Sequence, residues 1–502
     1  MRRLSSAALG LVLASLLSCQ TVPARSTPAP SGAQAGGIVR VAIPGEVTSL
    51  DPWSADDPSL VATRQIFETL VTVDLATGRI GPGLASSWQA SNDGASWTFT
   101  LREGVRFHDG SSLDASAVVA SFERGRPSRY RLLFDDPPVI ARTQAVDART
   151  IRFDLRTPFG PFLAHLGAPQ AAIARGTSGS GPFAAGDSAL APDGTLTLRR
   201  SDSYWRRDPS GKTLPYLDGL VLRPVRDAAS RLAELRGGRV EVALDLPVAQ
   251  AAAARSDPSL ALLQRRDAAL ASLGINASVP PFDRPEARRA VAMTIGPPSA
   301  LDAVYAGLAR RAIQVVPLGA LGYDDSVVAF APLDVAGAKK LLADARVPTP
   351  INVDLAYPIV ATAAYPDPQR IAQSIAADLG AIGVVARLRA VDPSALRDDT
   401  AAFTLDTTPI GLDPDDVFWP LFGSDDAANV SLVVGLLRKA RTEADPTKRT
   451  ELYKQVSKIA RSEVLRVPLL FADRANAASA RVAGYAPTTG WSDSFGTVWL
   501  RP

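Results

Sequence analysis

The sequence predicts an α/β protein with two or three domains, and three observations support this prediction. Its 502 residues exceed what one ordinary hydrophobic core accommodates. Hydrophobic residues make up 46% of the chain and charged residues 21%, which is typical of a folded soluble protein. From about residue 262 onward, segments with strand patterns alternate with segments of helical periodicity, as they do in α/β domains.

The first half of the chain is rich in strand patterns. In "SWTFTLR", Trp97, Phe99 and Leu101 alternate with polar residues, which predicts a half-buried strand. The residues that follow predict a turn at 103–104, a returning strand at 105–107, a turn at 109–110 and a helix capped by Asp114. We also expect strands at 37–44, 150–158 and 194–205, a helix running into a strand at 63–74, and a glycine-rich loop at 179–187.

The second half combines strands with capped helices. The first expected helix is 284–295, because Pro285 suits the first position of a helix. Asp334 and Asp445 are predicted to cap two more helices. The remaining expected elements are a strand and crossing segment at 261–278, a helix at 367–383 ended by Gly383, strands at 350–358 and 384–392, and an apolar strand leading to residue 474.

The chain has two histidines, and neither pattern around them favours catalysis. His108 lies at a strand end between two turns, where a side chain often satisfies loop backbone groups, so we favour that role over a catalytic pair with Asp109. His165, in "PFLAHLGAP", is interpreted as a packed or surface imidazole. The motifs GxSxG and HExxH are missing from the sequence, and we expect no enzyme activity, no cofactor and no metal site made by the protein alone.

The N-terminus has the pattern of a lipoprotein signal. Arg2 and Arg3 precede the apolar run "AALGLVLASLL", which is too short to span a bilayer but suits a signal-peptide core over residues 1–18. The run ends in "LLSC", which resembles a bacterial lipobox with Cys19 as the lipid-bearing residue. Cys19 is the single cysteine of the chain; the alternative is an ordinary cleaved signal with an incidental cysteine. Residues 19–37 are rich in Pro, Ala, Ser and Gly, which predicts a flexible tether.

The charge balance gives no support for nucleic-acid binding. Removal of Arg2 and Arg3 with the signal peptide lowers the count of 54 basic residues by two, against 51 acidic residues. The remaining body is therefore nearly neutral, and its sequence contains no clustered basic stripe.

Several segments, in order along the chain, resemble the family 5 extracellular solute-binding proteins, the peptide-, nickel- and opine-type receptors of ABC importers. These segments are "TSLDP", "GLASSWQASNDGASWTFTLREGVRFHDGSSLDASAVVASFER", "SGPF", "YW", "LPYLDGLVLRPV", "PPFDRPEARRAVAMTI", "DVAGAKKLLADA", "DPDDVFWPLF" and "LRVPLLFA". The resemblance covers nearly the whole chain after the tether. It places "GVRFHDG" in a structural subdomain, in agreement with the interpretation of His108.

The resemblance implies a two-lobe periplasmic-binding-protein fold of the large, three-subdomain type, with the ligand cleft between the lobes. Lobe I would comprise residues 38–265, with a subdomain inserted at about 56–175, and lobe II residues 266–475. Residues 476–502 would return to lobe I. The implied protein is a monomeric receptor, anchored through Cys19 on the extracytoplasmic face (periplasmic or cell-surface side), that delivers solute to an ABC importer permease.

One departure from the family bears on the ligand. In peptide-binding members, an aspartate three positions before the Asp-Pro of "DPD" pairs with the ammonium group of the ligand; here that position is Ile410. Isoleucine cannot partner a buried ammonium, so Asp406 or Asp413 would have to substitute. The alternative for Asp413, Asp415 and Asp416 is turn and helix-start chemistry beside Pro414.

Two tryptophans are further candidates for ligand contact. Trp53 follows "LDP" at a place that borders the cleft in relatives, and Trp419 follows the acidic loop. Each is either a stacking surface for a ligand or part of the core. We therefore predict a receptor for a peptide or another small polar solute. The alternative is a lipoprotein of the same fold with a regulatory or partner-binding role in the cell envelope.

Overall fold

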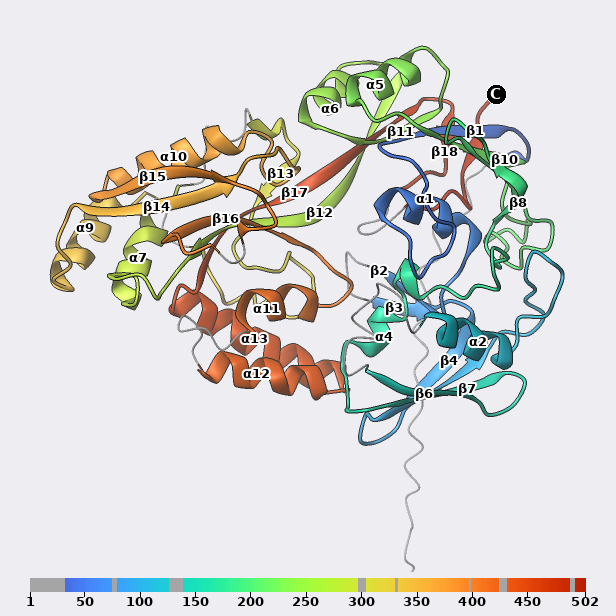
Figure 1. Ribbon diagram of the computed structural model, residues 1–502, viewed down its shortest axis with the longest axis horizontal. Coiled ribbons are helices and arrows are strands. Elements are labelled where there is room, and N and C mark those ends of the chain that lie inside the picture. Colours follow the sequence, from blue (N-terminus) through green and yellow to red (C-terminus); the bar gives the residue numbers. More distant parts are fainter. Residues whose placement is uncertain are drawn as a thin grey trace, which may run out of the picture.

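The computed structural model describes residues 32–74, 79–125, 139–296, 304–329, 333–396, 399–423, 431–487 and 493–502. The predicted signal peptide and Cys19 lie outside these residues. Within them, the dominant element is an 11-stranded mixed sheet with the strand order β15-β14-β16-β12-β17-β11-β1-β10-β9-β8, in which β13 also pairs with β17. Figure 1 shows this sheet running through the whole molecule.

Two long antiparallel strands, β12 (Leu260–Ile275) and β17 (Arg466–Ser479), join the two halves of the sheet. On one side, β11 (Val242–Leu246) pairs with the end of β17, and on the other, β16 (Phe403–Pro409) pairs with β12 only from Ala269 onward. The register of β12 against β17 shifts between Arg265 and Ala269. Among the described strands, β12 and β17 are therefore the two that continue from one half of the sheet into the other.

The first half of the sheet has helices on both faces. Its strands are β11, β1 (Ile38–Ile43), β10 (Gly219–Pro224), β9 (Leu196–Arg200) and β8 (Phe183–Leu190). On one face, α5 (Ala228–Arg236) and α6 (Val248–Arg255) pack against alanines such as Ala42 and Ala243. On the other face, α1 (Asp57–Ile66) packs with Val39 and Val41. Strands β18 (Val482–Ala483) and β19 (Trp499–Leu500) form a small antiparallel two-stranded sheet near the C-terminus.

A separate sheet of four strands lies below α1 in Figure 1. Its order is β4 (Ala85–Ala90), β5 (Ser96–Leu101), β7 (Thr150–Leu155) and β6 (Ile140–Ala145). Together with α2 (Ala115–Gly125) and α4 (Phe162–His165) it forms what we call the four-stranded unit, whose core is rich in phenylalanine. The short strands β2 (Val71–Asp74) and β3 (Arg79–Pro82) and the 3₁₀ helix η1 (Pro169–Ala171) lie beside it.

Two expectations for this region were wrong. Residues 105–107 form no returning strand; Arg106 makes one isolated bridge to Ser112, because β4 and β7 already occupy both edges of β5. The expected loop at 179–187 ends early, because Phe183 is buried and begins β8 opposite Arg200. The alternation in β5 is confirmed, since Trp97, Phe99 and Leu101 are all buried.

The second half of the sheet carries two helical layers. On one face, α7 (Pro285–Thr294), α9 (Val335–Asp344) and α10 (Pro368–Gly380) pack on β14 (Ile351–Pro358) and β16, with β15 (Val384–Val391) at the sheet edge. On the other face lie α11 (Asp415–Phe422), α12 (Ser431–Thr442) and α13 (Pro446–Ser462), which we call the helical layer. Strand β13 (Ala309–Arg311) pairs with β17.

The helix starts predicted in this half are confirmed. Asp334 accepts a hydrogen bond from the backbone N–H of Gly337, and Asp445 accepts from Thr447 and Lys448. Pro285 occupies the first turn of α7. In the described part of the chain, no helix has the length and apolar character that crossing a membrane requires.

Candidate functional site

The acidic loop "PIGLDPDD" lies where the four-stranded unit meets the helical layer. Strand β16 ends at Pro409, and α11 starts at Asp415 after the N-cap Pro414. Ile410 is half-buried and packs against the helical layer, whereas Leu412 is buried in the core of the four-stranded unit. The loop therefore contacts both parts of the molecule.

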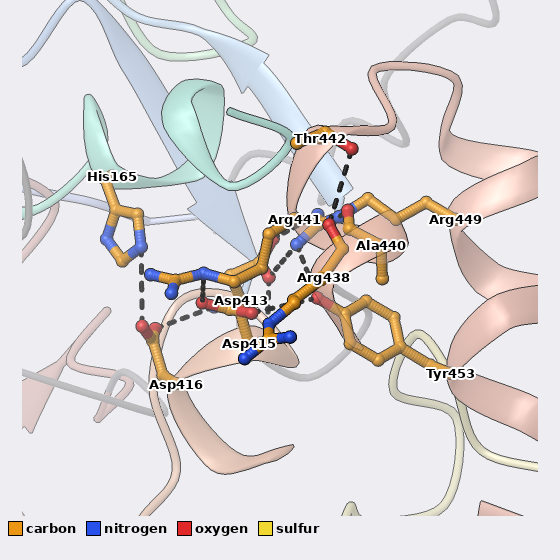
Figure 2. A network of polar contacts seen from close by, with 10 residues as sticks. All are labelled: His165, Asp413, Asp415, Asp416, Arg438, Ala440, Arg441, Thr442, Arg449 and Tyr453. Carbon is orange, nitrogen blue, oxygen red and sulfur yellow. Dashed lines mark hydrogen bonds and ion pairs between the residues drawn. The ribbon is translucent and has the colours of Figure 1, made fainter. Parts of the chain in front are cut away.

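Asp413 forms a buried ion pair with Arg449 of α13. Nη1 of Arg449 donates to Oδ2 of Asp413 at 2.6 Å, and Nη2 donates to Oδ1, while both side chains are 6% exposed. Arg449 also donates to the carbonyl oxygen of Ala440 at 3.0 Å and to the hydroxyl of Tyr453 at 2.8 Å (Figure 2). Burial alone would raise the pKa of Asp413, but the charge of Arg449 and its hydrogen bonds hold this pKa below its ordinary value.

Asp415 is buried beside Arg441 of α12. Its Oδ2 lies 3.1 Å from Nε of Arg441, and the carboxylate is 4% exposed. Burial raises the pKa of Asp415 to about 7 against the opposing charge of Arg441, and the neighbouring carboxylate of Asp413 adds to the rise. The guanidinium of Arg441 stacks over Trp419 at 4.1 Å and lies 5.5 Å from the ring centre of Phe159, which belongs to the core of the four-stranded unit.

Asp416 reaches the four-stranded unit itself. Its Oδ1 lies 3.4 Å from Nε2 of His165 (Figure 2). The imidazole of His165 is 1% exposed and stacks on Phe159. Burial raises the pKa of Asp416, while His165 opposes the rise. The backbone N–H of Gly160 donates to the carbonyl oxygen of Arg441 at 2.6 Å. We call His165, Asp413, Asp415, Asp416, Arg441, Arg449 and Tyr453 the polar junction.

Asp406 forms an ion pair on the face of the sheet that carries the helical layer. Its carboxylate pairs with Arg466 of β17 and accepts a hydrogen bond from the hydroxyl of Thr404 at 2.9 Å. Arg466 also donates to Oγ of Ser272 at 3.1 Å. The two carboxylates that were candidates to replace the missing aspartate, Asp406 and Asp413, therefore both have arginine partners within the protein.

The tryptophans and His108 occupy different surroundings. Trp53 is 2% exposed and packs edge-on against Phe122 at 5.3 Å, whereas Trp419 is partly exposed under Arg441. His108 lies outside the polar junction: its Nε2 is 2.9 Å from the carbonyl oxygen of Gly181, and its backbone N–H donates to Gly179. The interpretation of His108 as a residue that satisfies loop backbone groups is confirmed.

Sequence reasoning grouped the three aspartates but missed their partners. Arg449 and Arg441 come from helices that follow the loop, and His165 comes from α4, far earlier in the chain. Local patterns hold no signal for such pairs. Within the described ranges, no group of three or more His, Cys, Asp or Glu residues is arranged to hold a metal ion.

Comparison with known proteins identifies the family. The model of the bacterial extracellular solute-binding proteins, family 5 Middle, matches residues 79–429. The chain is 28% identical to heme-binding protein A of Haemophilus influenzae over 86% of each chain. It is 29% identical to di/tripeptide-binding protein 2 of Pseudomonas aeruginosa, covering 84% of this chain and 87% of that protein. It is 28% identical to the glutathione-binding protein GsiB of Salmonella paratyphi A, covering 90% and 93%.

Solved structures show the same fold. HbpA2 of Haemophilus parasuis superimposes with a TM-score of 0.82 at 24% identity, over 93% of this chain and 100% of that one. The unliganded open form of MppA, a periplasmic murein tripeptide binding protein, gives a TM-score of 0.80 at 19% identity, over 94% and 99%. The mixed α/β fold predicted from the sequence is thus confirmed as that of family 5 periplasmic binding proteins. The chain belongs to the bacterial extracellular solute-binding proteins of family 5, which are substrate-binding proteins of peptide-type ABC importers and not enzymes.

Proposed function

We propose that this protein is a lipid-anchored extracytoplasmic receptor that captures a peptide or another small polar solute and delivers it to an ABC importer permease. The proposal is carried by the family match over residues 79–429, together with a sheet in which β12 and β17 alone, of the described strands, join the two halves. Two crossing strands form a narrow connection, about which two lobes can rotate to enclose a ligand. The proposed lobes are residues 38–265 with 476–502, and residues 266–475.

The polar junction supports this division. His165 of α4, within the first proposed lobe, faces Asp416 of α11 in the second, and the backbone N–H of Gly160 donates to Arg441 of α12, while the pairs of Asp413 and Asp415 with arginine lie within the second lobe. Leu412 of the second proposed lobe is also buried against the four-stranded unit, and the polar groups of the contact can exchange their hydrogen bonds for bonds to water when it opens. We assign the polar junction as the contact that holds the proposed lobes in the arrangement of this structure.

The ligand is proposed from the surroundings of Ile410. Ile410 supplies no charge, and Asp406 and Asp413 are already paired with Arg466 and Arg449. A buried ammonium on the ligand would therefore lack a free carboxylate partner at this place. This favours solutes that are recognised through groups other than an N-terminal ammonium. The relatives are named as binding proteins for heme, for di- and tripeptides, and for glutathione. We therefore propose small peptide-like solutes as the ligand class.

Lipid anchoring is tested by Cys19→Ala in cells that express the full chain. Because Cys19 is the single cysteine, the variant removes the one thiol that a lipid could modify. We expect the wild-type protein in the membrane fraction, with a mass increased by its acyl chains. The Cys19→Ala variant should lack that increase in mass. Equal membrane retention and equal mass would contradict the lipoprotein assignment.

Delivery is tested by uptake of a radiolabelled solute that the purified protein binds. Cells that lack the chain are expected to lose uptake at low solute concentration, and a plasmid copy should restore it. Unchanged uptake, with binding intact, would favour the regulatory alternative over import.

A further inference from the structure

A hollow of about 620 Å³ lies along β12, before the point at which β16 joins that strand. It is lined by Arg255, Leu262, Leu263, Gln264, Arg266, Tyr485, Ala486 and Pro487. Its volume falls in the range of about 300–1,000 Å³ that small-ligand sites occupy. Among these described lining residues the charged groups are two guanidinium groups and none is a carboxylate, so the described lining is positively charged.

Arg266 is the more available of the two arginines. It is exposed, and among the described residues its side chain makes no hydrogen bond or ion pair. Arg255 uses one nitrogen to donate to the carbonyl oxygen of Ala306, and Gln264 donates to the carbonyl oxygen of Gly307 at 3.3 Å. The fork of an unpaired guanidinium matches a carboxylate through two parallel hydrogen bonds. Arg266 is therefore the natural partner for an anionic ligand group.

The wall beside these arginines is apolar. Leu262 and Leu263 line it from both faces of β12. The hydroxyl of Tyr485 is already engaged, because it donates to Asp493 at 2.8 Å and accepts from Asn476 at 2.7 Å. The ring of Tyr485 is 9% exposed and stacks on Phe495, with ring centres 5.1 Å apart, so it can offer a ligand only a small part of its apolar surface. The hollow thus combines a cationic end with an apolar wall.

Charges behind the strand do not cancel this positive character. The carboxylate of Asp245 lies 3.9 Å from Arg265 and 3.7 Å from Arg474. One carboxylate is shared by two guanidinium groups, and Nε of Arg265 is buried without a hydrogen-bond partner. Asp493, which faces Tyr485, is 1% exposed and bonded to Asn476.

The strand itself contributes polar groups. From Leu260 to Arg265, β12 pairs with β17 on one edge, and no described strand pairs with its other edge. An unpaired sheet edge of this kind can accept the polar main chain of a ligand through its backbone N–H and C=O groups.

We propose that this hollow binds the anionic end of the solute, and that the solute is an organic acid with an apolar body, such as a peptide acid whose N-terminus need not be charged. The carboxylate pairs with Arg266, supported by the charge of Arg255, and the apolar body packs on Leu262, Leu263 and the ring of Tyr485. This inference rests on the proposed function, because it names the chemical class of the captured solute.

The test is isothermal titration calorimetry on the full chain, purified in detergent, with three probes. N-acetyl-leucyl-leucine carries a carboxylate and no ammonium, its C-terminal amide carries neither charge, and leucyl-leucine amide carries only the ammonium. We expect the acid to bind about tenfold or more tightly than the uncharged amide, because charge-assisted hydrogen bonds to arginine are lost in the amide.

Three variants assign the effect to the hollow. Arg266→Gln is expected to weaken binding of the acid about tenfold and to leave the uncharged amide unchanged, and Arg266→Lys should restore part of the loss. Arg199→Gln on β9 is the matched control, since Arg199 is also exposed without a described partner and lies outside the hollow. Neither glutamine variant removes a side-chain hydrogen bond or ion pair between described residues, so both should fold as the wild-type chain does.

The outcomes separate this inference from the proposed function. Equal affinity for acid and amide, preference for the ammonium probe, or equal effects of Arg266→Gln and Arg199→Gln would overturn the anionic assignment while leaving solute capture intact. Binding of none of the three probes, with binding of a sugar or metal chelate, would also overturn it. Binding of no solute at all would overturn the proposed function and the inference together.

Discussion

The imidazole of His165 faces the carboxylate of Asp416 across the polar junction, with Nε2 3.4 Å from Oδ1. The two residues come from α4 and the first turn of α11, and both side chains are buried or nearly so. Two further carboxylates, Asp413 and Asp415, share this buried region with Arg449 and Arg441. The junction therefore concentrates titratable groups where two packing units meet.

We predict that the raised pKa of Asp415 makes the stability of the protein depend on pH. Its carboxyl has a pKa of about 7 in the folded protein, against about 3.9 when unfolded. The folded state holds this proton more tightly, so the resulting stabilisation is present below about pH 4 and is lost as the pH rises through about 7. Asp415→Asn removes this titration. As the pH rises between these limits, the free energy of unfolding of the wild-type protein should fall more steeply than that of the variant. The difference in slope should reach up to about 1.4 kcal/mol per pH unit.

The measurement is urea denaturation of both proteins at several pH values between 4.5 and 8. Groups that the two proteins share cancel in the difference, so the slope of that difference reports Asp415. Parallel stability curves across this range would show that Asp415 titrates as an ordinary carboxyl.

We predict a large loss of stability when Arg449 is replaced. Arg449→Met leaves the 6%-exposed carboxylate of Asp413 without its partner, and breaking a buried pair in this way costs about 3–5 kcal/mol. Arg387→Met is the control, because Arg387 is 77% exposed in its pair with Asp354, and exposed pairs contribute about 0–1 kcal/mol. Similar losses in the two variants, measured by guanidinium denaturation, would contradict the buried character of the junction.

We predict that a side chain at position 160 would prevent the close approach of the four-stranded unit and the helical layer. A Cβ atom at this position would lie 2.4 Å from the carbonyl oxygen of Glu443 and 2.8 Å from Nε of Arg449. Gly160→Ala should therefore cost about 1–3 kcal/mol by forcing the units apart. Gly435→Ala in α12 meets nothing within 4 Å and should instead stabilise by up to about 1 kcal/mol. Thermal unfolding distinguishes them; a neutral Gly160→Ala would mean that the units do not approach this closely in solution.

Ile410 predicts a change of ligand preference. The resemblance to family 5 places an aspartate at this position in peptide-binding members, where it pairs with the ligand ammonium. Ile410→Asp should therefore strengthen binding of leucyl-leucine amide about tenfold relative to the unmodified chain. Ile410→Leu keeps an apolar side chain of the same size and should not. Calorimetric titration checks both, and equal affinities in the two variants would show that residue 410 lies away from the bound solute.

The parts of the fold predicted correctly from the sequence are those that local chemistry decides. Asp334, Asp445 and Pro285 begin helices because each satisfies or omits backbone N–H groups in a single turn. The alternation in β5 placed Trp97 and Phe99 inside without any knowledge of the rest of the molecule. The returning strand at 105–107 failed because strand pairing depends on which edges are free, and β4 and β7 had taken both.

The site was less predictable from the sequence, because its contacts also depend on how distant segments pack. Of the two roles considered for Asp413, the structure shows the turn and helix-start contact, since its Oδ1 accepts from the backbone N–H of Asp415 at 2.9 Å. Its pairing with Arg449 depends on how α13 packs, and the pairing of Asp416 with His165 depends on contact between distant segments. The sequence contains these residues, but spacing along the chain does not encode such contacts.

The most direct test of solute capture is a thermal-shift screen of the purified protein against di- to oligopeptides, opines, sugars and metal chelates. A solute at a hundredfold excess over its dissociation constant should add about 2.7 kcal/mol of stability, which is readily visible as a rise in Tm. We predict such a rise with peptide-like acids, lost when the carboxylate is converted to an amide. No rise with any solute would contradict the assignment as an import receptor and favour a regulatory or partner-binding role in the cell envelope.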